Sequence, residues 1–397
     1  MTTLRSRIGV EIELIAPPGA SRRALADRLA LEQHGNVART FHTDSEASLV
    51  PGMGHFWHLT PGFEVRGPSG ELVVSLVDDV TLVADLRREQ DEARRRSDTG
   101  PVPPGADGAD GADGAEGTDG VDEHSYRVLS DDARLLRLVA DRTDPDTPFG
   151  RVLDDVAPLF GSTVETVGAV RRLRDRAGAS IALAAALAPG RERPCEIVTP
   201  PLDRDHEAAL EALLRPAREL GFTVPVESAV HLHLDAGPYR SVAAFANLVR
   251  LFGHWRDALH DALGTNPSCT RLQPLPPALL ELVEQPVPGG ADRATAWSRL
   301  QAAASATGLS KYFDVNLTAL LADRPARDTL EVRILPGSLH GRDVTARAGL
   351  VEALLARCLE PEAVPRPTSA DPAGAVAELH ALAGFIPPAE NDRAGRR

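Results

Sequence analysis

The segment IGVEIEL, residues 8–14, alternates apolar and acidic side chains along its length. Successive side chains of a β-strand point to opposite faces, so residues i and i+2 share a face. The segment therefore predicts a strand whose apolar side chains enter the core, while Glu11 and Glu13 lie together on the opposite face. Most strands with a single pair of acids only mark the solvent side of a sheet. The other strands of the chain indicate whether Glu11 and Glu13 belong to a functional site.

Other predicted strands repeat this alternation, with polar side chains on one face and apolar side chains on the other. Their polar positions are Glu196 in CEIV (195–198), His231 and His233 in VHLHLD (230–235), and Glu331 and Arg333 in LEVRIL (330–335). Carboxylates are hard oxygen ligands that suit Mg²⁺ or Mn²⁺, and an imidazole can complete a metal site. A guanidinium presents fork-like donors to phosphate oxygens. The combination predicts a site for a divalent cation and a phosphate group.

The composition excludes several classes of protein. A net charge of −14 argues against a general nucleic-acid-binding protein, which needs a basic face to neutralise phosphates. Cys195, Cys269 and Cys358 are scattered, and they form neither a disulfide framework nor a CxxC zinc pattern. The N-terminus has no apolar run of signal-peptide length, and no stretch approaches the roughly 20 apolar residues of a membrane span. We expect a soluble, cytoplasmic protein with no nucleic-acid or membrane partner.

The segments between these strands divide into predicted helices and predicted sheet. Helical patterns occupy residues 21–34, 205–220, 241–263 and 293–306, and residues 126–188 are predicted to be mostly helical. Residues 55–85 predict a β-meander, because strand-like runs flank a Gly-Pro-Ser-Gly turn. Within that meander Glu64 and Arg66 repeat the Glu-x-Arg pattern, and we interpret them as a surface ion pair of small energetic value.

Residues 98–123 have a different composition from the rest of the chain. Near-repeats of Gly, Asp and Ala cannot bury a core, so this stretch predicts an acidic, disordered insert. The expected organisation is one catalytic domain over residues 1–360 that carries this insert. A peripheral C-terminal tail follows over residues 361–397.

The motifs IGVEIEL, CEIVTPPL, VHLHLD, KYFDVNL and LEVRILPGS occur in this order between residues 8 and 340. In this order they resemble the amidoligase family of carboxylate–amine ligases, which shares the catalytic fold of glutamine synthetase and glutamate–cysteine ligase. The resemblance implies an α+β fold with a curved, antiparallel half-barrel sheet and helices packed on its outer face. It also implies an enzyme that uses ATP and Mg²⁺ (or Mn²⁺) to form an amide bond through an acyl phosphate. The substrates would be a small molecule or peptide with a carboxylate, and an amine; an oligomer is compatible with this fold.

The resemblance also implies roles for individual residues on the predicted strands. The implied metal ligands are Glu11, Glu13, Glu196, His231 and Glu331. His233 would lie nearer the nucleotide, and Arg333 would contact the transferred phosphate.

Two further segments carry implied roles on the substrate side. FHTDSEASL, residues 41–49, resembles an acidic segment of the family, which makes Asp44 a candidate base or anchor for the ammonium group. KYFDVNL resembles the family segment that makes Lys311 and Asn316 candidates for substrate contact. Lys311 is also the only lysine in the chain.

Three other functions remain open on the sequence alone. A phosphotransferase of the guanidine-kinase type would use the same fold but form an N-phosphate. A metal-dependent hydrolase could be built on the strand with His231 and His233, since His-x-His pairs bind Zn²⁺. A non-catalytic relative that binds nucleotide or protein is disfavoured, because every expected metal ligand is present.

Overall fold

The computed structural model describes residues 4–47, 55–82, 123–269, 272–285, 292–323 and 327–384, together with residues 84, 86–88, 91, 95 and 325. The chain divides into two compact units. Unit 1 contains Met1–Leu14, Val198–Glu219 and Thr223–Arg397; unit 2 contains Ile15–Ile197 and Leu220–Phe222. Residues 98–122 of the predicted insert and residues 385–397 of the predicted tail lie outside the described residues.

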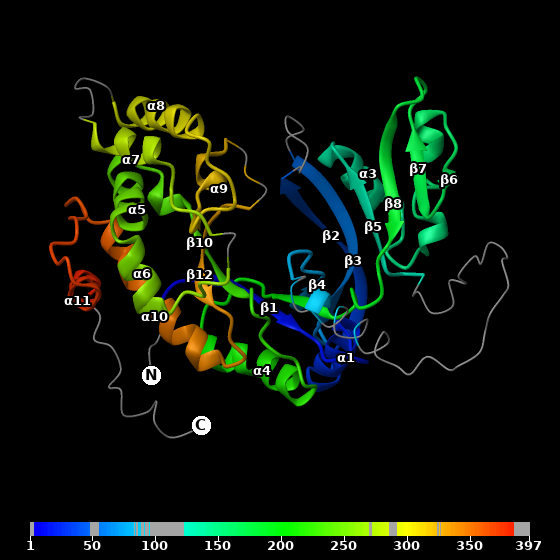
Figure 1. Cartoon of the computed structure of the whole chain (residues 1–397), viewed down its shortest axis with the longest axis horizontal. Helices are drawn as coiled ribbons and strands as arrows, with labels where there is room; N and C mark the ends of the chain where they lie inside the picture. The colour runs from blue at the N-terminus through cyan, green and yellow to red at the C-terminus, as the bar shows by residue number, and fades with distance from the viewer. Residues whose placement is uncertain are drawn as a thin grey trace. The chain divides into compact units, whose positions relative to one another are not determined.

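The strands of unit 1 carry most of the predicted site residues. β1 (Ile8–Ile15), β10 (Ala229–Asp235), β12 (Thr329–Pro336) and the short β11 (Val315–Asn316) lie in the order β11-β12-β10-β1. Figure 1 labels β1, β10 and β12 of this group. Each of these neighbouring pairs is antiparallel. Every residue of β1 is buried, including both glutamates, so this strand is interior on both faces.

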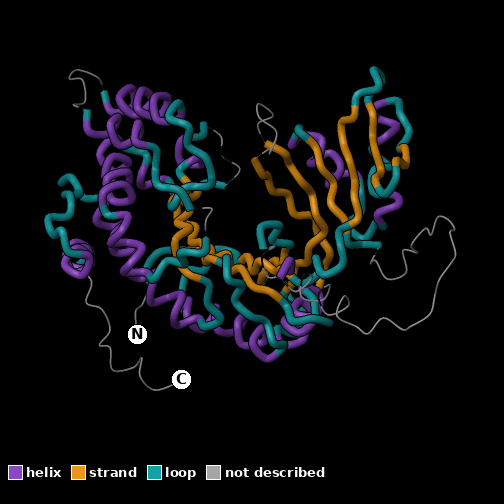
Figure 2. The backbone as a smooth tube through the Cα atoms, in the orientation of Figure 1, coloured by secondary structure: helices purple, strands orange, loops and turns teal. Residues whose placement is uncertain are grey.

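The helices of unit 1 confirm the helical predictions for residues 205–220, 241–263 and 293–306, with one break. They are α4 (His206–Glu219), α5 (Val242–His254), α6 (Arg256–Leu263), α7 (Pro277–Glu284), α8 (Arg293–Ser305), α9 (Thr318–Leu321), α10 (Gly341–Cys358) and α11 (Pro372–Leu382), shown as purple coils in Figure 2. The predicted helix over 241–263 is interrupted at Trp255, which separates α5 from α6. Side-chain caps explain where two of them begin: Ser241 accepts from the amide of Ala244, and Asp292 from that of Thr295.

Unit 2 is built on a second set of antiparallel pairings. Its strands are β2 (Asn36–Ala47), β3 (His55–Arg66), β4 (Leu72–Val77), β5 (Tyr126–Ser130), β6 (Glu165–Val167), β7 (Val170–Arg174), β8 (Ser180–Ala186) and β9 (Pro194–Val198). They follow the order β9-β4-β3-β5-β8-β7-β6, with β2 paired to β3, and the sheet does not close on itself. The helices of this unit include α1 (Arg22–Glu32) and α3 (Ala133–Arg142).

The predicted meander is confirmed. β3 and β4 are antiparallel, and the turn between them is closed by the amide of Gly67, which donates to the carbonyl of Glu71 at 2.9 Å. Gly70 has a φ of +87°, a conformation that side chains with a Cβ rarely adopt. Glu64 and Arg66 form the expected ion pair on this hairpin, with Nη2 2.5 Å from Oε2 and the arginine 42% exposed.

The prediction that residues 126–188 are mostly helical is wrong. Only α3 and short 3₁₀ turns are helical there, and β5, β6, β7 and β8 occupy much of the remainder. The arginine-rich run misled the prediction, because its charges hide the alternation around the buried Leu173 of β7. Pairing with β6 and β8 decides the conformation, and Arg172 binds Glu165 across the β6–β7 pair at 2.9 Å.

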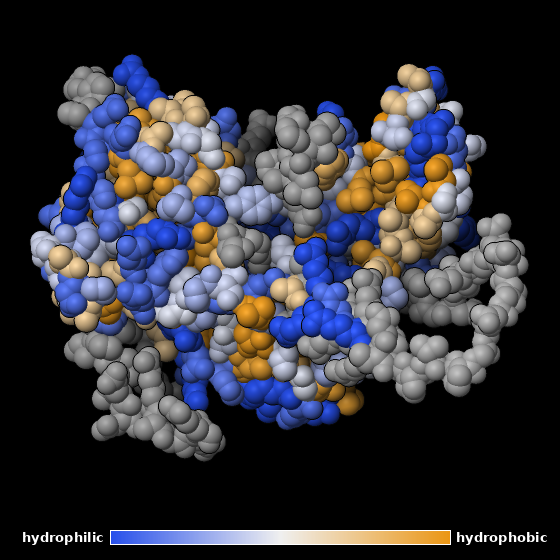
Figure 3. Space-filling model, in the orientation of Figure 1, coloured by the Kyte–Doolittle hydropathy of each residue, from blue (hydrophilic) through white to orange (hydrophobic). Residues whose placement is uncertain are grey.

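The core of unit 2 lies between α3 and the neighbouring strands. Tyr126, Leu136 and Leu153 are fully buried members of one apolar cluster. Hydrophilic residues cover much of the visible face of the molecule, with apolar residues between them (Figure 3). Among the described residues, no helix combines the length and the apolar character that crossing a membrane requires.

We expect Leu136→Ala to lower the free energy of unfolding by about 2–5 kcal/mol, because it leaves a cavity in this cluster. Leu31→Ala is the control, since Leu31 is 72% exposed and its truncation should change the value by less than about 0.5 kcal/mol. Urea unfolding of both variants measures the difference. Equal losses would show that the cluster does not carry the stability of this unit.

Candidate active site

The strand register of unit 1 brings the predicted polar residues onto one face. Glu11 of β1 lies directly opposite His231 of β10, and His233 lies opposite Glu331 of β12. Asn316 of β11 also lies opposite Glu331. Directly opposed residues of antiparallel strands point to the same side of the sheet. Side chains more than three hundred positions apart in the sequence are thus placed together.

His231 is the centre of this group. Its Nδ1 lies 3.2 Å from Oε2 of Glu11 and 3.4 Å from Oε1 of Glu331, and its Nε2 lies 3.5 Å from Oε1 of Glu13. All four side chains are buried. The other oxygen of Glu13, Oε2, accepts from the backbone amide of Ala229 at 2.8 Å, which fixes that carboxylate. Three carboxylates from two strands therefore meet one imidazole.

Cationic and polar groups surround the outer oxygens of these acids. Nε2 of His233 lies 3.1 Å from Oε1 of Glu11, and Nη1 of Arg333 binds Oε1 of Glu331. Asn316 donates from Nδ2 to Oε2 of Glu331 at 2.9 Å. These contacts offset part of the negative charge of Glu11 and Glu331.

Burial and neighbouring charges set the protonation of the two glutamates. Burial raises the pKa of Glu11, but the charge of His233 and hydrogen bonds from both histidines outweigh it and hold the pKa well below its usual value. Burial likewise raises the pKa of Glu331, but the charge of Arg333, with smaller contributions from His231 and His233, holds the pKa below its usual value. Both groups are therefore carboxylates at neutral pH.

The two histidines shift in opposite directions. Burial, reinforced by the charge of Arg333, lowers the pKa of His231, so its ring is neutral at pH 7 and has a lone pair for a metal. Burial also lowers the pKa of His233, but the charge of Glu11, the hydrogen bond to Glu11 and the charge of Glu331 together raise the pKa. The neutral ring lies among the acids, and the more basic ring lies beside Glu11.

These residues fit a hard divalent cation. Glu11 and Glu331 each offer a carboxylate oxygen, and these two atoms lie within 4.8 Å of each other. Carboxylate oxygens with one or two imidazoles suit Mg²⁺ or Mn²⁺. Buried carboxylates this close repel one another, so a cation between them would remove an electrostatic cost.

The remaining predicted residues lie on other strands and in a turn. Glu196 is on β9 and Asp44 is on β2, opposite His58 of β3, so both belong to unit 2. Lys311 lies in the turn before β11, with Nζ 5.6 Å from the centre of the Tyr312 ring. Their roles in metal or substrate binding stay predictions.

Sequence reasoning missed two residues of the site. Thr329 lies 3.3 Å from Nδ1 of His233 through its hydroxyl, and it could have been found because it shares a strand face with Glu331. Nη1 of Arg327 lies 3.1 Å from Oε1 of Glu11, although its side chain is 59% exposed. Arg327 precedes β12 in an irregular segment, so no periodic pattern indicates it.

A buried carboxylate also anchors the segment that carries Asn316. Asp314 is 1% exposed, and its Oδ2 lies 2.6 Å from Nε of Arg256 and 3.1 Å from Nε2 of His260. Both partners are on α6, and the carbonyl of Asp314 accepts from the amide of Arg333 at 3.0 Å. This contact ties α6 to the strands of the site.

Comparison with known proteins identifies the family at this point. A family model described as "Putative amidoligase enzyme" matches residues 4–355, which include every strand of the site. The chain belongs to the amidoligase family. The predicted resemblance is thereby confirmed, and the family name indicates an enzyme of the ligase type. No curated protein that was compared matches the chain.

We expect Glu331→Gln to weaken Mn²⁺ binding by at least about tenfold, because it removes a charged ligand from the buried group. Glu165→Gln is the matched control, since Glu165 pairs with Arg172 in unit 2. Titration calorimetry with Mn²⁺ measures both. Unchanged affinity in Glu331→Gln would contradict a metal site here.

The raised pKa of His233 predicts a pH dependence of stability in EDTA. A folded-state pKa above the ordinary 6.5 means that the His233–Glu11 interaction is fully present below that pH and is lost as pH rises through the folded pKa. The free energy of unfolding should therefore fall more steeply above about pH 6.5 in the wild type than in His233→Gln. Urea unfolding over a pH series tests this, and parallel curves would contradict it.

Proposed function

We propose that the protein is an ATP- and Mg²⁺-dependent ligase that joins a carboxylate to an amine through an acyl-phosphate intermediate. One observation carries the proposal: Glu11, Glu13 and Glu331 meet His231 on a buried strand face, with Arg333 bound to Glu331. Hard metal ligands beside a guanidinium are the set that the transfer of a phosphoryl group requires. Membership of the amidoligase family supports the same reaction class.

The chemistry explains why these groups are needed. A carboxylate resists attack by an amine, because the leaving group would be an oxide. Transfer of the γ-phosphoryl group of ATP to a carboxylate oxygen gives ADP and an acyl phosphate, which has a good leaving group. The amine then attacks the acyl carbon, inorganic phosphate leaves, and the amine loses a proton. Bringing ATP and a carboxylate together requires positive charge between them.

The proposed metal ligands are Glu11, Glu13, His231 and Glu331 of unit 1, with Glu196 of β9 as a further predicted ligand. Bound Mg²⁺ supplies charge neutralisation to the phosphate oxygens. The neutral state of His231 and the carboxylate state of Glu11 and Glu331 are the states in which these groups bind a cation.

Other residues have proposed roles around the reacting groups. Arg333 would stabilise the transferring phosphoryl group, and its contact with Glu331 orients it. His233 would lie on the nucleotide side. Asp44 would act as base or ammonium anchor, and Lys311 and Asn316 would contact substrate. These roles follow the family resemblance.

The proposal extends to the fold. The antiparallel pairings within unit 1 and within unit 2 are compatible with the curved, half-barrel sheet of glutamine synthetase. We propose, as part of the same fold, that helices pack on the outer face of this sheet.

The decisive experiment is an ADP-release screen with Mg²⁺ and ATP against libraries of carboxylates and amines. Release that needs both components, with an amide as product, supports the ligase. An N-phosphate product instead indicates a phosphotransferase, and turnover without ATP indicates a metal-dependent hydrolase. Either of these results would replace the proposal.

We expect Glu13→Gln and Arg333→Ala each to lower kcat by about 10²–10³-fold or more, because each removes an electrostatic contact to the transferring group. Glutamine can keep the hydrogen bond from the amide of Ala229, so the fold should survive the first change. Glu165→Gln and Arg172→Ala remove an ion pair of unit 2 and serve as controls. Full activity in either site variant would remove that residue from the mechanism.

A further inference from the structure

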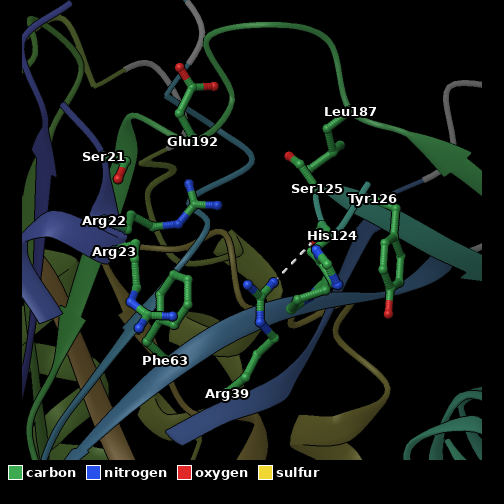
Figure 4. Close-up of a pocket in the computed structure, with 11 residues that line it drawn as sticks. Ser21, Arg22, Arg23, Arg39, Phe63, His124, Ser125, Tyr126, Leu187 and Glu192 are labelled. Atoms are coloured by element: carbon green, nitrogen blue, oxygen red, sulfur yellow. Dashed lines mark hydrogen bonds between the residues drawn. The ribbon is translucent and has the colours of Figure 1, made fainter. Parts of the chain in front are cut away.

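A polar pocket lies entirely within unit 2, beside the start of α1 (Figure 4). It holds no more than about 430 Å³ of empty space, including open solvent at its mouth, which limits an occupant to a small molecule. The charged and aromatic residues of its wall are Arg22, Arg23, Arg39, Phe63, His124, Tyr126 and Glu192. Cationic side chains therefore outnumber acidic ones in the wall.

Two of these arginines are held against one aromatic ring. The guanidinium carbons of Arg39 and Arg23 lie 5.3 Å and 5.5 Å from the centre of the Phe63 ring, which is itself buried. Cation–π contact fixes the guanidinium groups without using their N–H donors. The ring thus positions donors for a further partner.

The acidic partners of these two arginines are solvent-exposed. Arg39 pairs with Asp146, whose side chain is 73% exposed, and Arg23 pairs with Asp27, which is 53% exposed. Ion pairs at such exposed positions are weak and screened by salt. They can yield to an anion that enters the pocket.

Arg22 adds a buried guanidinium to the same wall. It is 6% exposed, and its Nη1 lies 2.5 Å from the carbonyl of Pro194, 2.6 Å from that of Arg191 and 3.2 Å from Oδ1 of Asp78. Within the described part of the chain, its buried Nε has no hydrogen-bond partner. A buried N–H without an acceptor is costly. Figure 4 shows this guanidinium reaching toward the space between Glu192 and Arg39.

The charge behind Arg22 is not balanced by its nearest carboxylate. Asp78 is fully buried at its side chain and contacts three guanidinium groups, those of Arg22 at 3.2 Å, Arg191 at 2.7 Å and Arg127 at 3.4 Å. The adjacent buried carboxylate of Asp79 offsets a second charge. Asp78 thus shares one negative charge among three guanidinium groups.

We propose that this pocket binds a singly charged organic carboxylate. The planar guanidinium groups match a carboxylate, and Phe63, Pro61 and Leu187 supply apolar wall for the organic part. The carboxylate of Glu192 in the same wall repels a dianionic phosphate more strongly than a monoanion. The site is distinct from the acidic group of unit 1, and the inference does not depend on the reaction proposed above.

Benzoate tests the proposal, because it combines one charge with an apolar body, and benzamide has the same shape without the charge. Calorimetric titrations at constant ionic strength, in EDTA and without ATP, compare benzoate, benzamide and inorganic phosphate. We expect benzoate to bind at least about tenfold more tightly than either of the other two, since only it has both the charge and the apolar part.

Substitutions in the wall of the pocket test whether benzoate binds there. Arg39→Gln and the more exposed Arg23→Gln should each weaken benzoate binding by at least about fivefold, because each removes a charged donor. Arg66→Gln is the matched control, since it removes an ion pair from the same β2–β3 hairpin outside the pocket. Glu331→Gln should bind benzoate as the wild type does, which separates this test from the proposed ligase site.

Several results would overturn the assignment. These are the absence of benzoate binding, equal binding of benzamide, tighter binding of phosphate, and an equal loss in Arg66→Gln. Circular dichroism of each variant before titration confirms that it is folded. Arg23→Gln keeps the test decisive if Arg39→Gln does not fold, because the side chain of Arg23 is 51% exposed.

Discussion

The burial of three carboxylates around His231 is the constraint on which the site of unit 1 depends. Buried charges are expensive unless opposite charges and hydrogen bonds compensate them. Here the compensation comes from different strands, through His233, Arg333 and Asn316. A slip of one residue between any two strands would turn these groups to the other face. The register of β1, β10 and β12 is therefore inseparable from the chemistry of the site.

Each unit contains a cluster of charged side chains, acidic in unit 1 and rich in arginine in unit 2. Unit 1 gathers buried acids whose repulsion a divalent cation would relieve. Unit 2 gathers three guanidinium groups around the buried Asp78, and among the described residues the Nε of Arg22 has no hydrogen-bond partner. In native structures, a partner such as an ordered water, an ion or a ligand satisfies most buried polar groups. The same physical argument thus leads to a cation in one unit and an organic anion in the other.

Much of the site of unit 1 was predictable from short-range pattern. Alternation along IGVEIEL, VHLHLD and LEVRIL placed Glu11 with Glu13, His231 with His233 and Glu331 with Arg333, and the family match confirms the resemblance drawn from these motifs. The pattern failed in residues 126–188, where arginine-rich strands have little apolar alternation and pairing with neighbours sets the conformation. Sequence analysis missed Arg327 for a related reason, since it lies in an irregular segment where side chains follow no periodic pattern.

The sequence by itself determined which side chains share a strand face, because that depends only on the two-residue repeat of a β-strand. Only the tertiary structure decided which faces meet. Antiparallel pairing placed Glu11 opposite His231 and His233 opposite Glu331, and a register shift between Val230 and Leu232 set the remainder of the β10–β12 pair. The cluster of Arg22, Arg127 and Arg191 around Asp78 was also invisible in the sequence. Contacts between distant segments depend on long-range packing, and no local pattern encodes it.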